Sequence, residues 1–236
     1  MSPKPTLILG ATGPSGICLL RELLHRNHPL IAFIRPQSVS KIPEDLVSNP
    51  LLQIVQGKLD DDESLSPAIA QCGAIISLVG PGQSAMSSKA PLPYPEYYEH
   101  HILPLMKKHG VKRIAAMSTI SVYVDEDVSK FIRWLMVTGV SYGFPAAYNT
   151  MLEIAKVFRE EKVEEIEWTI FRLPMLLGGS DEYAWKADRE RGEALAGPVS
   201  SLWSGKLNRS LLGKWLVDWV EKSQGKWVRE LPAISS

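Results

Sequence analysis

Short apolar runs alternate along most of the chain with segments whose apolar residues recur at helical spacing. The runs predict six strands, and the segments between them predict helices. Strands joined through helices favour right-handed crossovers, so we predict an α/β fold, a Rossmann-type doubly wound parallel sheet in the order 3-2-1-4-5-6. The predicted strands are 6–9, 30–34, 51–55, 74–79, 111–117 and 166–171, and the predicted helices include 17–24, 95–109, 127–140, 146–159 and 211–222.

The first apolar run ends at a glycine, and two further glycines follow at a spacing of three as a helical pattern begins. In a dinucleotide-binding turn, the first glycine closes the strand, the second lets backbone approach a pyrophosphate, and the third lets the helix pack on the strand. The free N–H groups of the helix's first turn would then face the phosphates. We therefore predict cofactor binding by Gly10, Thr12, Gly13, Pro14, Ser15 and Gly16, against the alternative of an ordinary glycine-rich turn.

The ends of the next strands supply the remaining cofactor candidates. Arg35 follows the second strand, where proteins that bind NAD carry an acidic residue for the ribose hydroxyl. A guanidinium there can pair with a 2′-phosphate, which predicts NADP(H), although a surface arginine is the simpler alternative. Asp60 follows the third strand and could touch the adenine edge, and Gly80 and Pro81 follow the fourth.

The composition changes after Gly178 and Gly179, where the chain becomes polar and is interrupted by glycine up to residue 208. We expect residues 1–236 to form a single NAD(P)-binding Rossmann domain. Within it, about 175–236 would form a small substrate-binding lobe beside the carboxyl ends of strands 4 to 6. Residues 226–229 could add a last short strand.

The charge balance and the cysteine content limit the kinds of partner and site that we expect. The 236 residues carry 26 basic and 26 acidic side chains, so no net field attracts nucleic acid or an anionic membrane. Cys18 and Cys72 belong to no CxxC pair and lie in predicted helices, and no histidine pattern suggests a metal site. With no apolar run of spanning length and no room for a leader peptide, we expect a cytoplasmic protein, a monomer or a homodimer.

These motifs together resemble the atypical short-chain dehydrogenase/reductases, particularly the NmrA-like and biliverdin-reductase-B-like branch. The glycine turn, the Arg35 strand end and the run 57–60 match, as do 110–119 and 168–174, so the resemblance spans residues 6–174. The carboxy-terminal part is similar to small fungal proteins of this group. The resemblance implies that Leu173 and Pro174 lie near the nicotinamide amide of the cofactor.

In that superfamily a serine after the fifth strand polarises a substrate carbonyl, and the tyrosine of Y-x-x-x-K passes a proton. Ser118 matches the serine by its place after the strand. Tyr148 is the best candidate for the tyrosine, but Leu152 stands where the motif has lysine, so this phenol lacks the adjacent cation that would activate it. Tyr148 could be merely structural, and Tyr123 and Tyr142 are rivals.

These observations predict an NADP(H)-dependent oxidoreductase that acts on a small, largely apolar organic molecule, in keeping with specialised metabolism. Ser118, Tyr123 and Tyr148 would orient the substrate or donate a proton. Two other classes stay open, because a Rossmann cleft does not fix its chemistry. One is a non-redox isomerase, epimerase or cyclase, and the other is an NmrA-like sensor that binds dinucleotide without turning it over.

Overall fold

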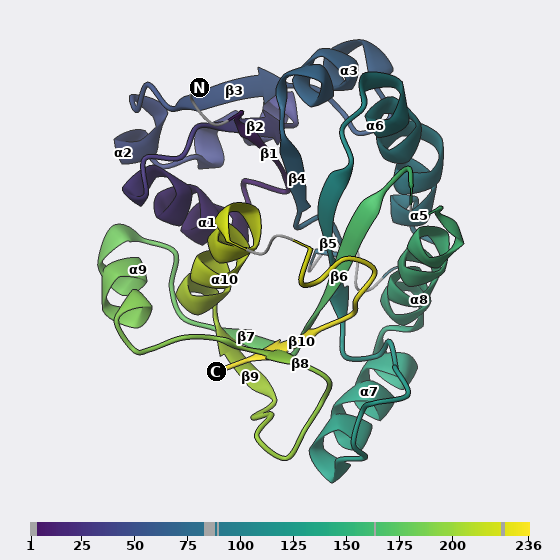
Figure 1. The fold of residues 1–236 in the computed structure, drawn as a ribbon. Coiled ribbons are helices and arrows are strands. Elements are labelled where there is room, and N and C mark those ends of the chain that lie inside the picture. The colour runs from purple at the N-terminus through teal and green to yellow at the C-terminus, as the bar shows by residue number, and fades with distance from the viewer. Residues whose placement is uncertain (1–3, 83–87, 89, 163, 223–224) are drawn as a thin grey trace.

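A central sheet organises the molecule, and helices cover both of its faces (Figure 1). The computed structural model describes residues 4–82, 88, 90–162, 164–222 and 225–236. Within them, eight strands follow the order β3-β2-β1-β4-β5-β6-β10-β8, which confirms the predicted order 3-2-1-4-5-6 and extends it. The strands are β1 (Thr6–Leu9), β2 (Leu30–Ile34), β3 (Leu52–Gln56), β4 (Ala74–Ser77), β5 (Arg113–Thr119), β6 (Glu167–Leu173), β8 (Leu195–Gly197) and β10 (Ala233–Ser235).

The helices form two layers, one on each face of the sheet (Figure 1). One layer holds α1 (Pro14–His25), α2 (Glu44–Val47) and α10 (Arg209–Glu221), and α9 (Glu182–Arg189) packs against α10 and α1. The other layer holds α3 (Asp62–Gln71), α5 (Tyr94–Tyr97), the π-turn η2 (Tyr98–Ile102), α6 (Leu103–His109) and α8 (Pro145–Glu160). A 3-10 turn, η1 (Pro36–Lys41), follows β2.

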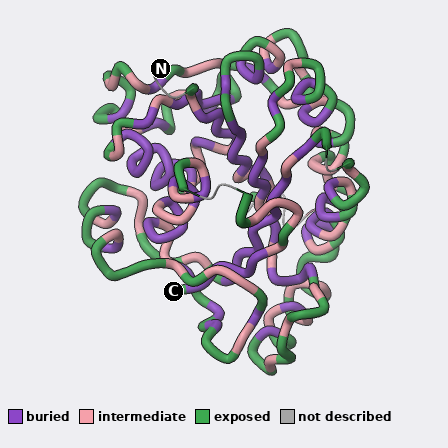
Figure 2. Tube along the Cα trace, viewed as in Figure 1, coloured by how far each residue is buried: buried purple, intermediate pink, exposed green. Residues whose placement is uncertain are grey.

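Alternation along the strands builds the two cores. Leu7 and Leu9 of β1 pack with side chains of α3, α6 and α8, whereas Ile8 between them packs with side chains of α1 and α10. All three are fully buried, and the central strands stand out as buried in Figure 2. Because both faces are covered, these strands read as continuous apolar runs in the sequence.

Residues 175–236 contribute to several parts of the molecule. β7 (Met175–Leu177) and β9 (Lys206–Asn208) form a small parallel sheet of their own. β10 pairs in parallel with β6, β8 pairs antiparallel with β10, and α10 packs along α1. No helix in the described residues is long and apolar enough to cross a membrane.

Two expected boundaries are wrong. The last strand is Ala233–Ser235, and residues 226–229 form turns instead. The helix α7 (Phe131–Gly143) begins at Phe131 and not at Asp127. Asp127 stays in the preceding loop, because its carboxylate accepts hydrogen bonds from Arg133 of α7 and Arg172 of β6. α8 starts at Pro145, as the predicted break before it requires, and Gly110 closes α6 with φ +67°, as a glycine C-cap should.

Candidate functional site

The three glycines of the first turn differ in what surrounds them. Gly10 has φ +82°, and a Cβ there would lie 2.8 Å from the backbone of Leu78. A Cβ on Gly16 would lie 2.4 Å from the carbonyl oxygen of Gly10, so this glycine lets α1 pack tightly on the turn. A Cβ on Gly13 would meet only that same oxygen, at 3.7 Å. The protein therefore leaves open space above the middle glycine, where a ligand's phosphates could approach.

The amino end of α1 has unused hydrogen-bond donors. Gly13 is its N-cap and supplies no side chain, and Pro14 occupies the first helical position. Thr12 and Ser15 flank the turn and are half-buried. An uncapped helix start combines free N–H groups with the positive end of the helix dipole, which suits an anion.

Arg35 and Asp60 lie at the carboxyl ends of the neighbouring strands β2 and β3, and both are exposed. Sequence reasoning missed a third residue here, Tyr97 of α5. Burial raises the pKa of Tyr97, the charge of Asp60 raises it further, and the charge of Arg35 lowers it, so the three side chains are electrostatic neighbours. They frame the end of the turn where the adenosine half of a dinucleotide would lie.

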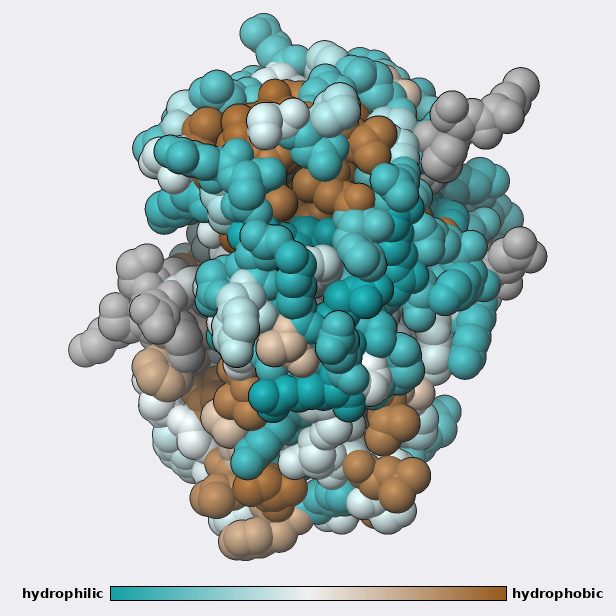
Figure 3. Space-filling model, turned by 90° about the vertical axis from the view of Figure 1, so that its left-hand side faces the viewer, coloured by the Kyte–Doolittle hydropathy of each residue, from teal (hydrophilic) through white to brown (hydrophobic). Residues whose placement is uncertain are grey.

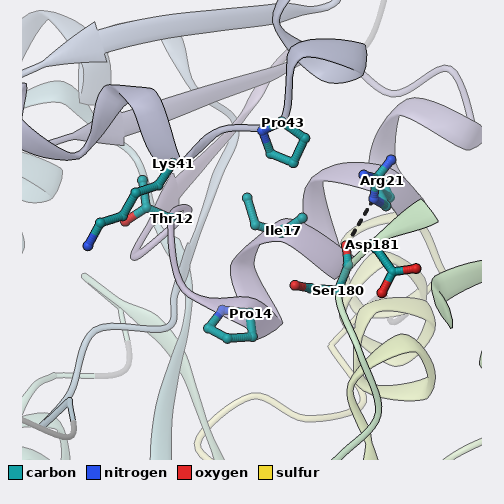
Figure 4. Close-up of a pocket in the computed structure, with 8 residues that line it drawn as sticks. All are labelled: Thr12, Pro14, Ile17, Arg21, Lys41, Pro43, Ser180 and Asp181. Atoms are coloured by element: carbon teal, nitrogen blue, oxygen red, sulfur yellow. Dashed lines mark hydrogen bonds between the residues drawn. The ribbon is translucent and has the colours of Figure 1, made fainter. Parts of the chain in front are cut away.

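A hollow of about 350 Å³ lies beside the turn, on the outer side of α1. Lys41, at the end of η1, and Thr12 line one side of it, and Ser180 and Asp181 line the other (Figure 4). Arg21 donates from Nε to the carbonyl oxygen of Ser180 at 3.1 Å and forms an ion pair with Asp45. Lys41 is a second missed residue, because only the turn η1 brings it back toward the glycines.

The middle of the site lies at the ends of β4 and β6. A Cβ on Gly80 would lie 2.7 Å from Cε of Met117 and 3.3 Å from Cε of Met151, so two methionine side chains fill the space beside it. Pro81 follows and is half-buried. Leu173 and Pro174 are buried at the end of β6.

The three catalytic candidates lie near one another along the chain but point to different surroundings. Ser118 is fully buried, and its hydroxyl donates to the carbonyl oxygen of Met151 at 3.4 Å. The ring of Tyr123, which is 54% exposed, lies 3.7 Å from the guanidinium of Arg133. Tyr148 is half-buried and packs against a small apolar cluster that also contains Trp203. Their catalytic role stays a prediction.

A buried ionic cluster holds the loop that carries Tyr123. The Asp127 carboxylate accepts from Nη1 of Arg133 at 2.7 Å and from Nη2 of Arg172 at 2.9 Å, and all three side chains are at most 2% exposed. It also accepts from the backbone N–H of Val199 at 2.8 Å. Burial alone would raise the pKa of Asp127, but the hydrogen bond from Arg172 and the bonds from backbone N–H groups hold that pKa well below its usual range.

Neither cysteine belongs to this site. Cys18 and Cys72 are both free and buried. Burial raises the pKa of Cys18 to about 11 and that of Cys72 to about 12. Each thiol therefore stays protonated near neutral pH and is a poor nucleophile.

Comparisons with known proteins bear on the family and the fold of this chain. The sequence is 32% identical over 83 residues to a probable pinoresinol-lariciresinol reductase of Arabidopsis thaliana, a stretch covering 35% of this chain and 26% of that protein.

Solved structures share the fold over nearly the whole chain. A short-chain dehydrogenase/reductase of Veillonella parvula, solved in complex with NADP, has a TM-score of 0.72 at 16% identity, over 99% of this chain and 94% of that one. ChuY, an anaerobillin reductase of Escherichia coli O157:H7, has a TM-score of 0.71 at 16% identity, over 98% and 96%. Residues 10–220 match a family described as NAD(P)H-binding, and the chain therefore belongs to the NAD(P)H-binding family.

Proposed function

We propose that this protein is an NADP(H)-dependent oxidoreductase that acts on a small, largely apolar organic molecule. The observation that carries the cofactor half is the open space above Gly13 at an uncapped helix start. Neighbouring glycines are closely packed, so the open position is specific to the place where a pyrophosphate would lie. Gly10, Thr12, Gly13, Pro14, Ser15 and Gly16 would hold the phosphates, and Gly80, Pro81, Leu173 and Pro174 would line the nicotinamide half.

The preference for NADP(H) rests on positive charge at the end of β2. Arg35 is exposed there, and Lys41 lines the same hollow as Thr12. Both cations could pair with a 2′-phosphate, and Arg35 could also stack on the adenine. Asp60 and Tyr97 would border the adenine edge.

The substrate half would be dry and apolar. Tyr148 packs with Ile120, Val137, Val199 and Trp203, which come from the end of β5, from α7 and from the loop between β8 and β9. Such a wall would exclude water and favour an apolar molecule with few polar groups. We place substrate between this wall and the cofactor, against residues of the 175–236 region.

The bound cofactor would supply a hydride, and the protein would orient the substrate and provide the proton. Tyr148 has no lysine four residues later and Ser118 is committed to a backbone carbonyl, so neither hydroxyl is obviously activated. The proton would come from Tyr148, Tyr123 or water. The same observation favours a second candidate, a sensor that binds dinucleotide without turnover.

Titration of the protein with NADPH and with NADH tests the cofactor proposal. We expect tighter binding of NADPH, and in Arg35→Ala a loss of roughly tenfold to 100-fold in NADPH affinity with NADH affinity unchanged, as for a charge-assisted contact of ~1.5–3 kcal/mol. Lys41→Ala should act in the same direction. Lys222→Ala, which removes an exposed lysine at the end of α10, is the matched control. Equal affinity of the wild type for both nucleotides would contradict the NADP(H) proposal.

A turnover assay distinguishes a reductase from a non-redox isomerase and from a dinucleotide sensor. The protein is incubated with NADPH and a panel of quinones, enones and carbonyl compounds, and nicotinamide absorbance and product mass are followed together. Oxidation of NADPH with a reduced product supports the reductase. Conversion of a substrate without oxidation of NADPH points to a non-redox isomerase. Binding of NADPH without conversion of any substrate points to the sensor.

A further inference from the structure

The helix α7 presents apolar side chains to solvent. Phe131 is 75% exposed, Trp134 56%, Leu135 51% and Tyr142 86%. Among the 13 residues of this helix, Arg133 is the only charged one, and it is buried in the cluster with Asp127. A helix that is apolar all round is normally covered on every side, yet α7 is covered only where it meets the body of the protein.

The exposed side chains form one continuous surface. Positions 131, 134, 135, 138 and 142 fall on one face at helical spacing, and the Phe131 and Trp134 rings stack with their centroids 5.7 Å apart. Lys130 donates from Nζ to the carbonyl oxygens of Ser201 and Trp203, which fixes the intervening Leu202 beside the start of α7. Leu202 is itself 75% exposed. We call Phe131, Ile132, Trp134, Leu135, Tyr142 and Leu202 the α7 surface.

The size of the α7 surface fits a protein interface. Its three aromatic side chains alone expose on the order of 450 Å², since each can bury ~150–250 Å². With Ile132, Leu135 and Leu202, the area approaches the ~800 Å² that one partner contributes to a standard interface. Figure 3 faces the side of the molecule that carries α9, away from α7 in Figure 1, and hydrophobic residues there are interspersed with hydrophilic ones.

Charge narrows the choice of occupant. The α7 surface has no exposed cation, and the exposed carboxylates Asp125 and Glu126 lie just before the helix. Helices that lie on anionic membranes carry lysine and arginine, so this charge pattern disfavours such a membrane. An acidic or a basic peptide would likewise find no opposite charge along the helix. An uncharged surface of this size is best matched by another surface of the same kind.

We propose that the α7 surface docks a second copy of this chain, with the two α7 helices antiparallel across a twofold axis. In such a pair, residue i meets residue j and j meets i. An axis midway between Phe131 and Tyr142 brings those two residues together, because both lie near the middle of the exposed face.

The mass of the full-length protein in solution, measured across a concentration series by sedimentation or light scattering, tests this proposal. We expect the wild type to be a dimer and Leu135→Glu to raise the dimer dissociation constant at least about 30-fold, because it brings two carboxylates to the axis. Tyr183→Glu changes a side chain on α9 that is 84% exposed, more than Leu135, and should leave the dimer intact. Circular dichroism melts of both variants report whether each chain is still folded.

Any of three results would overturn the proposal. The first is the mass of a single chain at every concentration up to that used for purification. The second is a single chain that binds neutral phosphatidylcholine vesicles through α7, with binding lost in Leu135→Glu, because lipid would then be the occupant. The third is a dimer that survives Leu135→Glu, because the interface would then lie elsewhere.

Discussion

Asp127 is the residue on which the rim of the candidate site depends most. Its carboxylate pairs with two buried guanidinium groups, so replacing it with a neutral amide leaves their charges uncompensated. We predict that Asp127→Asn lowers the free energy of unfolding by about 3–5 kcal/mol, measured by urea denaturation at neutral pH. Asp125→Asn changes an exposed carboxylate two residues away and is the control. A loss of less than about 1 kcal/mol in Asp127→Asn would show that the cluster contributes little net stability.

The pH dependence of this effect has a defined sign. The pKa of Asp127 is lower in the folded protein than its ordinary value of 3.8, so the unfolded chain binds its proton first. The stabilisation is therefore present above about pH 4 and is lost as the pH falls toward the folded pKa. Urea midpoints of wild type and Asp127→Asn should converge as the pH is lowered from 5 toward about 2.

Site residues could be predicted where they lie close together in the sequence or directly after a recognisable strand. Gly10, Gly13 and Gly16 share one turn, and Arg35 follows a recognisable strand, so sequence alone brought these positions together. Arg172 pairs with Asp127 across 45 residues of sequence, and no spacing rule joins them. Lys41 and Tyr97 were missed for the same reason. The burial of Ser118 against Met151 also depends on how α8 packs on β5, which periodicity does not report.

At the scale of elements, the turn between β1 and α1 gives a matched pair of glycine substitutions. We predict that Gly16→Ala destabilises the fold by about 1–3 kcal/mol, because its methyl group would lie 2.4 Å from the carbonyl oxygen of Gly10. Gly13 has φ −77°, which any residue adopts, and free space. Gly13→Ala should therefore melt close to wild type and lose NADPH affinity. Thermal melts and NADPH titration of both variants check this. Equal NADPH affinity of Gly13→Ala and wild type would contradict the role of Gly13 in phosphate binding.

Helix boundaries were predictable where the backbone itself determines them. Gly110 and Pro145 mark an end and a start because a left-handed residue closes α6 and a proline suits the first position of α8. The start of α7 was predicted four residues early. Asp127 has the composition of a helix start, but its carboxylate is bound by Arg133 and Arg172 and is not available as a cap. Tertiary ionic contacts therefore displaced a local preference.

At the scale of the whole molecule, the six-strand order followed from the strand and helix alternation, whereas the sheet's far edge did not. β10 and β8 have three residues each, too few to show an alternation of apolar and polar residues in the sequence. Their pairing is determined by β6, whose open side needs hydrogen-bond partners. The backbone N–H of Arg172 donates to the carbonyl oxygen of Pro232 at 2.8 Å, and its side-chain Nε donates to the carbonyl oxygen of Leu231 at 2.6 Å. The end of the chain thus completes both the sheet and the ionic cluster.

The last segment should therefore matter to stability far more than its length suggests. Ile234 is fully buried against the layer of α1 and α10, and we predict that Ile234→Ala lowers the free energy of unfolding by about 2–4 kcal/mol. Removing residues 231–236 should lower the free energy of unfolding further. It also takes away β10 and the carbonyl oxygens of Leu231 and Pro232, to which Arg172 donates. Removing Ser236 alone, an exposed residue, is the control and should cost about 1 kcal/mol or less. Urea denaturation of the three variants measures this order, and a truncated chain with the wild-type midpoint would mean that the sheet is complete at β6.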